Sequence, residues 1–474
     1  MTNAFPETGK SRDEVLAALT QSRSKDLKSD GRAFAFVYDP GEEARELART
    51  AFAACMPING LDPTVYPSAR TLENAVVKAC LELMHAPEGA VGTATAGGTE
   101  SVMLAVKTAR DFARKTREIK SPKMLLPITA HACFHKAAHY FGVEIVSVDV
   151  DPKTFRADVE DAKRKMSADV ILVVGSAPSY AHGVIDDITS LAALAQEHGS
   201  LMHVDACVGG CVLPFLRDNG VAGPDFDFGI EGVTSISMDL HKYGFAPKGI
   251  SVLLQRRREL RDAQYYTCAT WTGYSIINST TLGSKSVAAM GAAYSLIQHL
   301  GKAGYRERAT RMWDATQALV KMIDATDGIE MVGRPDMNLF AFTTTEGDVF
   351  TLADRLTAKG WLVQATYQFG PSPAHIHLTL DPENARRADA LAKDIVACVQ
   401  DLPPTQTAPE GVVAFLSNLA ENSAGVDTAA VVKEMGLGSG TMPDEAAPLH
   451  RIMNAMTPLQ REKLLVLFVG ELFT

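Results

Sequence analysis

The chain has 474 residues, of which 46% are hydrophobic and 22% charged, a mixture that excludes a mostly disordered protein. Its 46 basic and 56 acidic residues give a net charge of −10 at pH 7, which argues against a general nucleic-acid binder. Its seven cysteines include no CxxC pair, so free thiols and a cytoplasmic location are expected. The sequence predicts neither a signal peptide nor a transmembrane segment.

The first part of the chain predicts an N-terminal arm and helix over residues 1–58, with the helix beginning near Gly41. Two further helices are expected at 72–84 and 99–115. Strand-like runs then alternate with helical stretches such as 186–198. The expected strands are 123–128, 144–150, 170–174, 201–204, 234–238 and 250–254. Short apolar runs separated by helices predict an α/β fold with a mostly parallel central sheet covered by helices.

After residue 297 the regular alternation of strands and helices is expected to end. Residues 298–400 contain helices and shorter strands (338–343 and 376–380), which predicts a smaller C-terminal α+β domain. A proline-containing break then leads to a helical C-terminal extension, residues 401–474. Residues 59–297 therefore form the predicted large domain. In such a sheet, functional residues are expected at the carboxyl ends of the strands.

The strongest local pattern is GVTSISMDLHKYGFAPKG, residues 232–249. A strand delivers Asp239, His241 and Lys242 to its carboxyl end. A partly desolvated amine at Lys242 would have a lowered pKa and could act as a Schiff-base nucleophile. The alternative is a lysine that pairs with a neighbouring carboxylate.

A second pattern, LMHVDACVGG, places Asp205 at the end of a buried strand. A buried carboxylate needs a cationic partner or a proton, and a protonated pyridine nitrogen would supply one. The alternatives are a helix N-cap and a satisfied ion pair. A third pattern, TAGGTES at 95–101, opens a helix with glycines that let an anion approach its N-terminus, although many helices simply begin this way. Together the three patterns form a minimal holder for pyridoxal 5′-phosphate.

These motifs and their order resemble the pyridoxal-phosphate enzymes of the group II decarboxylase clan, which have the fold-type I architecture. Within that clan the chain most resembles the sphingosine-1-phosphate lyases. Further runs carry the resemblance: TAHACFHKAAHYFGV at 129–143, SAPSYAHGVIDD at 176–187 and TTLGSKS at 280–286. The similarity spans about residues 59–400.

The resemblance implies a role for each matching residue. Lys242 would form the Schiff base with the cofactor, Asp205 would keep its ring nitrogen protonated, and His131 would stack on the ring. The expected phosphate contacts are Gly98, Thr99 and His241, joined by Gly283 and Ser284 from the other subunit of a homodimer. The expected polar groups near the substrate are Tyr180, Lys248 and, as the weaker candidate, His182.

Several histidines have a simpler interpretation. His131, Cys133 and His135 alternate, so on a strand they could mimic a metal site. No carboxylate or further Cys/His pair at ligand spacing supports that, and no metal is predicted. His375 and His377 are expected to be structural, and Tyr180 could be only a packing aromatic.

Three positions depart from the pattern of the lyases. Asp62 stands where a histidine is expected near the substrate, Lys285 replaces an arginine, and His135 replaces an asparagine. An acidic group would repel a substrate phosphate, and lysine lacks the bidentate fork of arginine. Since none of the three belongs to the cofactor machinery, they bear on the choice of substrate.

The resemblance implies a pyridoxal-phosphate-dependent aldehyde-lyase of the sphinganine-1-phosphate aldolase type, an enzyme of sphingolipid metabolism. It would cleave an amphiphilic phosphorylated amine, taken from solution or a membrane surface, to a long-chain aldehyde and phosphoethanolamine. Lys242, Tyr180 and a relay through the cofactor phosphate all remain open as the base. The alternative within the clan is an amino-acid decarboxylase, which Asp62 mildly favours. A noncatalytic dimeric scaffold is disfavoured by the intact Lys242 and Asp205.

Overall fold

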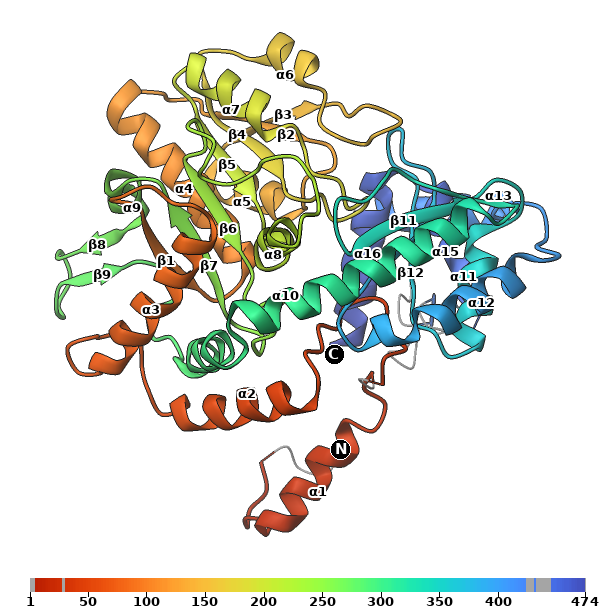
Figure 1. Ribbon diagram of the computed structural model, residues 1–474, viewed down its shortest axis with the longest axis horizontal. Coiled ribbons are helices and arrows are strands. Elements are labelled where there is room, and N and C mark those ends of the chain that lie inside the picture. The colour runs from red at the N-terminus through yellow and green to blue at the C-terminus, as the bar shows by residue number, and fades with distance from the viewer. Residues whose placement is uncertain (1–4, 28–29, 423–429, 432–444, 474) are drawn as a thin grey trace.

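A computed structural model describes residues 5–27, 30–422, 430–431 and 445–473, and these residues form two main sheets and one two-stranded hairpin (Figure 1). The larger sheet has seven strands in the order β1-β7-β6-β5-β4-β2-β3. Their bounds are β1 Val91–Thr95, β2 Lys123–Pro127, β3 Glu144–Val148, β4 Val170–Ser176, β5 Leu201–Asp205, β6 Ser235–Met238 and β7 Ser251–Gln255.

Strand direction in the large sheet determines where the site forms. Strands β2 to β6 run parallel, whereas β7 is antiparallel to both β6 and β1. The carboxyl ends of β1, β4, β5 and β6 therefore meet at one edge, together with the amino end of β7. All seven residues of β4 are buried, as expected for a strand covered on both faces.

Helices cover both faces of this sheet (Figure 1). The helices up to the end of the large sheet are α1 Arg12–Ser22, α2 Glu42–Cys55, α3 Pro67–Leu83, α4 Gly98–Arg117, α5 Cys133–Phe141, α6 Val159–Lys165, α7 Ile188–Glu197, α8 Leu213–Asp218 and α9 Arg258–Gln264, with a 3-10 turn at Gly209–Cys211. A small hairpin follows, formed by β8 Tyr266–Cys268 and β9 Ile276–Asn278. In Figure 1, α1 projects away from the body of the molecule, and none of its residues is buried.

The smaller domain is built on an antiparallel sheet in the order β10-β11-β13-β12. Its elements are β10 Ile329–Met331, β11 Leu339–Thr344, α11 Val349–Ala358, β12 Gln364–Thr366, β13 His375–Thr379, a 3-10 turn at Asn384–Arg387 and α12 Ala388–Val399. The N-terminal arm joins this domain, because the Phe34 N–H donates to Leu362 O at 2.8 Å and Phe34 is fully buried there.

One long helix, α10 (Ala288–Asp324), links the two domains, and α2 packs along it (Figure 1). Its 37 residues are interrupted at Gly301, where φ is +54° and ψ is −178°. Glycine adopts that backbone conformation readily, whereas other residues are strained in it. The domain boundary predicted between residues 297 and 298 falls inside this helix.

The C-terminal extension contributes α13 Glu410–Glu421, α15 Ala447–Ala455 and α16 Pro458–Leu472. These helices share a small apolar core that includes Leu416, Met453 and Leu464. They dock on the small domain, where Arg451 forms an ion pair with the buried Asp348 at the start of α11. The extension therefore packs as part of the small domain.

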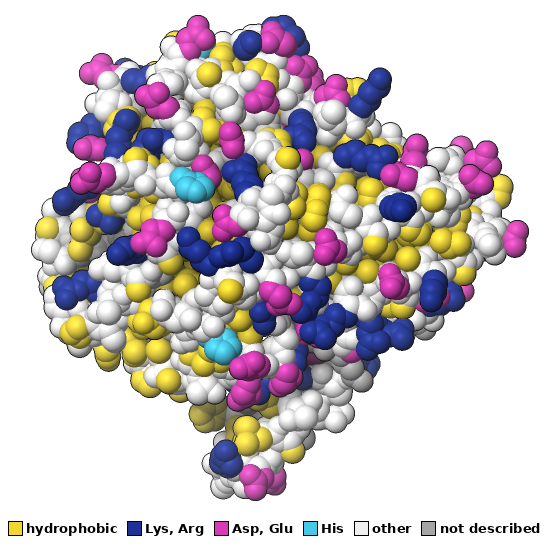
Figure 2. Space-filling model, in the orientation of Figure 1, with side chains coloured by type: hydrophobic (Ala, Val, Ile, Leu, Met, Phe, Trp, Pro, Cys, Tyr) yellow, Lys and Arg dark blue, Asp and Glu magenta, His cyan; other side chains and the backbone are white. Residues whose placement is uncertain are grey.

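Six strands predicted for the large sheet are confirmed, each within two residues of the observed bounds. Strand β1 was not expected, because its residues VGTAT are small and only partly apolar. Among the described residues, no helix is long and apolar enough to cross a bilayer. On the face drawn in Figure 2, basic and acidic side chains are interspersed and form no large region of one sign.

Candidate active site

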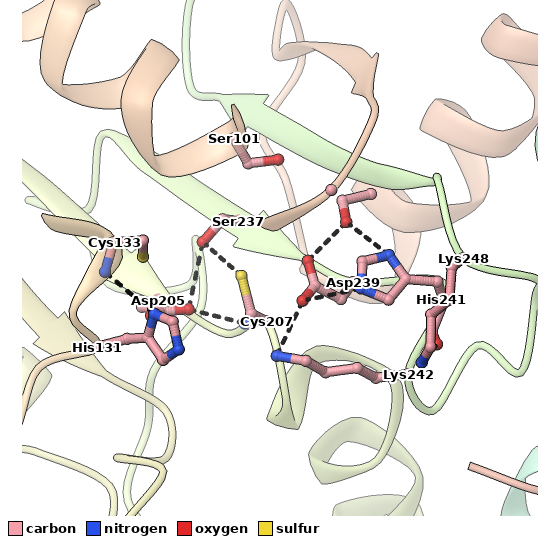
Figure 3. Close-up of polar contacts among 12 residues, drawn as sticks. Ser101, His131, Cys133, Asp205, Cys207, Ser237, Asp239, His241, Lys242 and Lys248 are labelled. Carbon is pink, nitrogen blue, oxygen red and sulfur yellow. Dashed lines mark hydrogen bonds and ion pairs between the residues drawn. The ribbon is translucent and has the colours of Figure 1, made fainter. Parts of the chain in front are cut away.

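A cavity of about 500 Å³ opens at the edge where the carboxyl ends of β1, β4, β5 and β6 meet. The turns after these strands supply most of its lining. The sequence-predicted residues that line it are Gly98, Thr99, His131, Tyr180, Asp205, His241 and Lys242. In Figure 3 the side chain of Lys242 extends toward Asp205 and His131. The structure thus brings together residues that are up to 144 positions apart in the chain, from Gly98 to Lys242.

Lys242 lies in the turn that follows β6, and its Nζ is 2.9 Å from Oδ2 of the buried Asp239. The Ser251 hydroxyl, at the start of β7, donates to Asp239 Oδ1 at 2.6 Å. Burial would lower the pKa of Lys242, but the negative charge of Asp239 outweighs it and raises that pKa. The expected lowering of the Lys242 pKa is therefore wrong, and the lysine does pair with a neighbouring carboxylate.

Asp205 is the last residue of β5 and only 8% exposed. Its Oδ1 accepts the Cys207 N–H at 3.0 Å and the Ser237 hydroxyl at 3.5 Å. Within the described part of the chain, no basic side chain forms an ion pair with it. The alternative of a satisfied ion pair is thus not found, and the carboxylate retains acceptor capacity on the side of the cavity.

The turn between β1 and α4 forms an anion cradle. The first N–H groups of a helix have no carbonyl partner within it, and here they belong to Gly98, Thr99 and Glu100. A Cβ at Gly98 would lie 2.6 Å from Asp239 Oδ1, so only glycine fits. The Glu100 carboxylate accepts the Ala96 N–H at 2.6 Å and holds the turn closed.

His241 borders the same cradle. Its Nδ1 donates to Ile250 O at 2.9 Å, which fixes the ring, and burial lowers its pKa. An anion cradle, a ring-facing carboxylate at Asp205 and an amine at Lys242 are the groups that a pyridine aldehyde phosphate requires. The residues present therefore fit pyridoxal 5′-phosphate.

His131 lies just before α5, and its Nδ1 accepts the Cys133 N–H at 3.2 Å. Because α5 begins at Cys133, residues 131–135 do not form a strand. His131, Cys133 and His135 therefore do not alternate along a strand, and the arrangement that could have mimicked a metal site does not form. The ring of His131 lines the cavity, where an aromatic cofactor ring would lie.

Lys248 does not line this cavity. Its Nζ donates to His241 O at 3.0 Å and lies 4.7 Å from the centre of the Tyr38 ring. Desolvation and repulsion from Lys242 lower its pKa. Lys248 instead lines a neighbouring groove, together with Tyr38 and His241.

His182 lies outside the cavity as well. It is 2% exposed, stacks on Phe155 with ring centres 4.2 Å apart, and its Nε2 is 2.9 Å from the Ser372 hydroxyl. Burial and the nearby His375 and His377 lower its pKa to about 3. Its contacts are those of a structural histidine between the two domains.

The segment carrying Gly283 and Ser284 is exposed and does not reach the cavity of its own chain. Thr281, just before it, does line the cavity, and its N–H donates to Glu100 Oε1 at 2.8 Å. Asp62 is also exposed and accepts the Thr64 N–H at 2.8 Å. The structure therefore does not place Asp62 at the cavity of its own chain.

Several residues near the site were not predicted as site residues, and four of them have polar side chains that bear on its electrostatics or its anchoring. Asp239, Glu100 and Thr281 line the cavity, and Tyr38 lies beside Lys248. Burial raises the pKa of Tyr38 to about 12. Asp239 and Glu100 stand inside the quoted motifs, so their spacing from Lys242 and Gly98 could have identified them. Tyr38 comes from the N-terminal arm, and no sequence pattern connects it with the site.

Comparison with known proteins agrees with this geometry. Residues 11–345 match the pyridoxal-dependent decarboxylase conserved domain, and residues 394–471 match the C-terminal putative HTH domain of pyridoxal-dependent enzymes. The sphingosine-1-phosphate lyase of Drosophila melanogaster is 35% identical over 403 residues, covering 85% of this chain and 74% of that protein. A probable L-aspartate decarboxylase of Pyrococcus furiosus is 33% identical over 362 residues, covering 76% of this chain and 95% of that protein.

Solved structures show the same fold. The sphingosine-1-phosphate lyase of Burkholderia pseudomallei superposes with a TM-score of 0.81 at 29% identity, covering 90% of this chain and 97% of that one. A glutamate decarboxylase of Lactobacillus brevis gives a TM-score of 0.73 at 22% identity, covering 85% and 95%. The predicted fold class and the cofactor, pyridoxal 5′-phosphate, are confirmed. The chain belongs to the pyridoxal-dependent decarboxylase family and, within it, is related to the sphingosine-1-phosphate lyases.

Proposed function

We propose that the protein is a carbon–carbon lyase that cleaves a phosphorylated sphingoid base of the sphingosine-1-phosphate type. The products would be a long-chain aldehyde and phosphoethanolamine. The observation that carries this proposal is the 35% identity to a sphingosine-1-phosphate lyase over 85% of the chain. The match to the pyridoxal-dependent decarboxylase domain, residues 11–345, includes the residues that line the cavity.

In the proposed reaction the chain binds the cofactor and orients the substrate. Lys242 would hold the cofactor through its amine, and Asp205 would keep a proton at the ring nitrogen. When bound, pyridoxal 5′-phosphate supplies an acceptor for the electron pair released by bond cleavage. A base removes the proton from the substrate's C3 hydroxyl, the C2–C3 bond breaks, C3 leaves as the aldehyde carbon and C2 takes up a proton.

Tyr180 is the candidate that supports this reaction from the cavity wall. Its hydroxyl donates to Gln364 Oε1 at 2.7 Å, while its ring packs 4.3 Å from His377. Burial raises the pKa of Tyr180, so the phenol remains protonated at neutral pH. Gln364 accepts the single phenol proton here, so Tyr180 would donate to a substrate oxygen by turning away from Gln364. Lys242 then remains a candidate for the base.

The proposal includes a homodimer with shared active sites in the cytoplasm. Gly283 and Ser284 are exposed and adjoin a segment anchored on the cradle by Thr281 and Glu100. They are thus available to a second subunit, whose cavity they would complete. A soluble dimer would take its amphiphilic substrate from solution or from a membrane surface.

The second candidate function is an amino-acid decarboxylase, and one observation favours it. The 33% identity to a probable L-aspartate decarboxylase covers 95% of that protein. One assay separates the two candidates: purified holoenzyme is supplied with sphingosine-1-phosphate and, separately, with a panel of amino acids. Aldehyde release supports the lyase. Carbon dioxide release from an amino acid without aldehyde release supports the decarboxylase.

A further inference from the structure

Strands β5 and β6 place four polar side chains on one face of the sheet. The two strands pair in parallel, with His203 opposite Ser235 and Asp205 opposite Ser237. Alternate residues of a strand share a face, so all four side chains point to the same side. Each is at most 8% exposed. A buried polar group needs a partner, and these four provide partners for one another.

The contacts form a continuous chain. His203 Nδ1 lies 2.8 Å from the Ser235 hydroxyl, and His203 Nε2 lies 3.1 Å from the Ser237 hydroxyl. The Ser237 hydroxyl lies 3.5 Å from Asp205 Oδ1 and 3.3 Å from Cys207 Sγ. Figure 3 shows Ser237 between Asp205 and Cys207. The chain therefore ends on the carboxylate that faces the cavity.

A count of the available protons identifies the donor and the acceptor in each of these hydrogen bonds. Ser237 has one hydroxyl proton and two lone pairs, and it has three polar neighbours. Asp205 is ionised in the role proposed for it and can only accept, so the hydroxyl proton of Ser237 goes to Oδ1. Ser237 then accepts from the Cys207 thiol and from His203 Nε2–H. His203 is neutral, because burial lowers its pKa to about 4, so its Nδ1 accepts from Ser235.

We propose that Ser235, His203 and Ser237 form an ordered hydrogen-bond chain that stabilises the Asp205 carboxylate and directs its Oδ2 to the ring nitrogen of the cofactor. The inference rests on the proposed role of Asp205. The Ser237 hydroxyl and the Cys207 N–H occupy Oδ1, so Oδ2 remains for the cofactor. Because both donors bind Oδ1, they hold the carboxylate with Oδ2 available to the cavity that Asp205 lines.

These three side chains are positioning residues, because none of them is among the residues that line the cavity, whereas Asp205 is. His203 is held from its other side by Phe134 of α5, whose ring centre lies 5.9 Å from that of His203. This packing and the two serines prevent the imidazole from turning. The tautomer of His203 is therefore a specific, measurable consequence of the proposal.

The first test reads that tautomer by nitrogen-15 NMR of histidine-labelled holoenzyme, with His203→Gln used only to assign the signals. The expected result at pH 7 is a protonated Nε2 and an unprotonated Nδ1. A protonated Nδ1 with a bare Nε2, or a doubly protonated ring, would overturn the proposal. This test needs no variant at Ser237 and therefore does not depend on how such a variant folds.

The second test reads the ring nitrogen itself, with nitrogen-15-labelled pyridoxal 5′-phosphate bound to Ser237→Ala. The ring signal should move toward that of an unprotonated pyridine. The cofactor should also bind more weakly, with a Kd about tenfold higher. Ser200→Ala is the matched control, because Ser200 is a buried serine whose hydroxyl donates to Val170 O at 2.7 Å. An unchanged ring signal and Kd in folded Ser237→Ala would contradict the proposal.

Neither readout uses a sphingoid substrate. If the cleavage assay fails but the tautomer and the ring signal are as expected, the proposed substrate is wrong and this inference stands. If aldehyde is released but His203 is protonated at Nδ1, the lyase proposal stands and this inference falls.

Discussion

Lys242 and Asp239 form a 2.9 Å ion pair within a single turn at the end of β6. The carboxylate raises the pKa of the lysine and therefore stabilises the ammonium form. An ammonium cannot attack an aldehyde, so the pair sets how readily the chain captures its cofactor.

Replacing that carboxylate should accelerate cofactor capture. Asp239→Asn removes an opposite charge beside Lys242, which lowers the lysine pKa and increases the neutral amine present at pH 7. The rate constant for loading pyridoxal 5′-phosphate should rise about tenfold, and its increase with pH should begin at lower pH. Stopped-flow absorbance between pH 6 and 9 measures both. Ser251→Ala keeps the charge and should change the rate less, and slower capture by folded Asp239→Asn would refute the argument.

Lys242 should be the only lysine that the cofactor modifies. Borohydride reduction of the loaded protein, followed by peptide mapping, should place the label on Lys242. Lys242→Ala should lack the visible absorbance band and have no measurable turnover. A label on Lys248 would show that the wrong lysine has been assigned.

Two inactive chains should restore activity if the subunits share their sites. A mixture of Lys242→Ala and Gly283→Asp chains places one intact site in each mixed dimer. After subunit exchange, about one quarter of the unmodified activity should return. Lys242→Ala mixed with Asp205→Ala is the control. Each of these chains has a defect in its own cavity, so both sites of a mixed dimer stay defective. If exchange is demonstrated and the first mixture remains inactive, the site is self-contained.

Lys248 should act on the substrate and leave cofactor binding intact. Its ammonium lies in the groove next to the cavity, so it can neutralise a substrate phosphate without touching the cofactor cradle. Lys248→Met should retain the visible band and lose about 10- to 100-fold in kcat/KM for the phosphorylated sphingoid base. Lys163→Met, on the surface helix α6, is the control. Asp62→His should leave this activity equal or increase it. The lyase proposal fails if Lys248→Met is fully active and the unmodified protein decarboxylates an amino acid.

Three histidines between the domains should make the protein sensitive to acid. Burial lowers the pKa of His182 and His377 to about 3, and it also lowers that of His375. An unfolded histidine has a pKa of about 6.5, so below that pH the unfolded chain binds protons that the folded chain does not. Each histidine can thus cost up to about 1.4 kcal/mol of stability per pH unit as the pH falls.

The experiment compares Tm between pH 7.5 and 5 for the unmodified protein and for His182→Gln. The variant should show a shallower decrease of Tm with falling pH. His198→Gln, on the surface, should behave like the unmodified protein. Because buried carboxyls such as Asp381 titrate in all three proteins, only the difference in slope is diagnostic, and equal slopes would contradict the prediction.

The parts of the fold that were predictable from the sequence are those set by local pattern. Buried parallel strands such as β4 are continuous apolar runs, and the motifs around Asp205 and Lys242 lie directly after such runs. Since the carboxyl ends of parallel strands share an edge, chain order alone indicated that these residues would meet.

The parts that were not predictable depend on contacts between distant segments. Tyr38 reaches Lys248 from the N-terminal arm, which is anchored on the small domain at residues 33 and 34. Tyr180 donates to Gln364, which is 184 positions away in the chain. The ion pair of Lys242 could be anticipated as an alternative, but its effect on the pKa depends on how deeply Asp239 is buried. Burial of that kind is a property of the packed molecule.

The strand β12 and the two residues after it connect the catalytic cavity with the C-terminal helices. At one end, Gln364 accepts the hydroxyl of Tyr180. At the other, the Tyr367 hydroxyl lies 3.1 Å from His450 Nδ1, and the Gln368 N–H donates to Asn454 at 2.7 Å. A substitution that reshapes the surface on which the C-terminal helices dock should therefore also move an anchor of the cavity wall, although it lies far from the cofactor-binding residues.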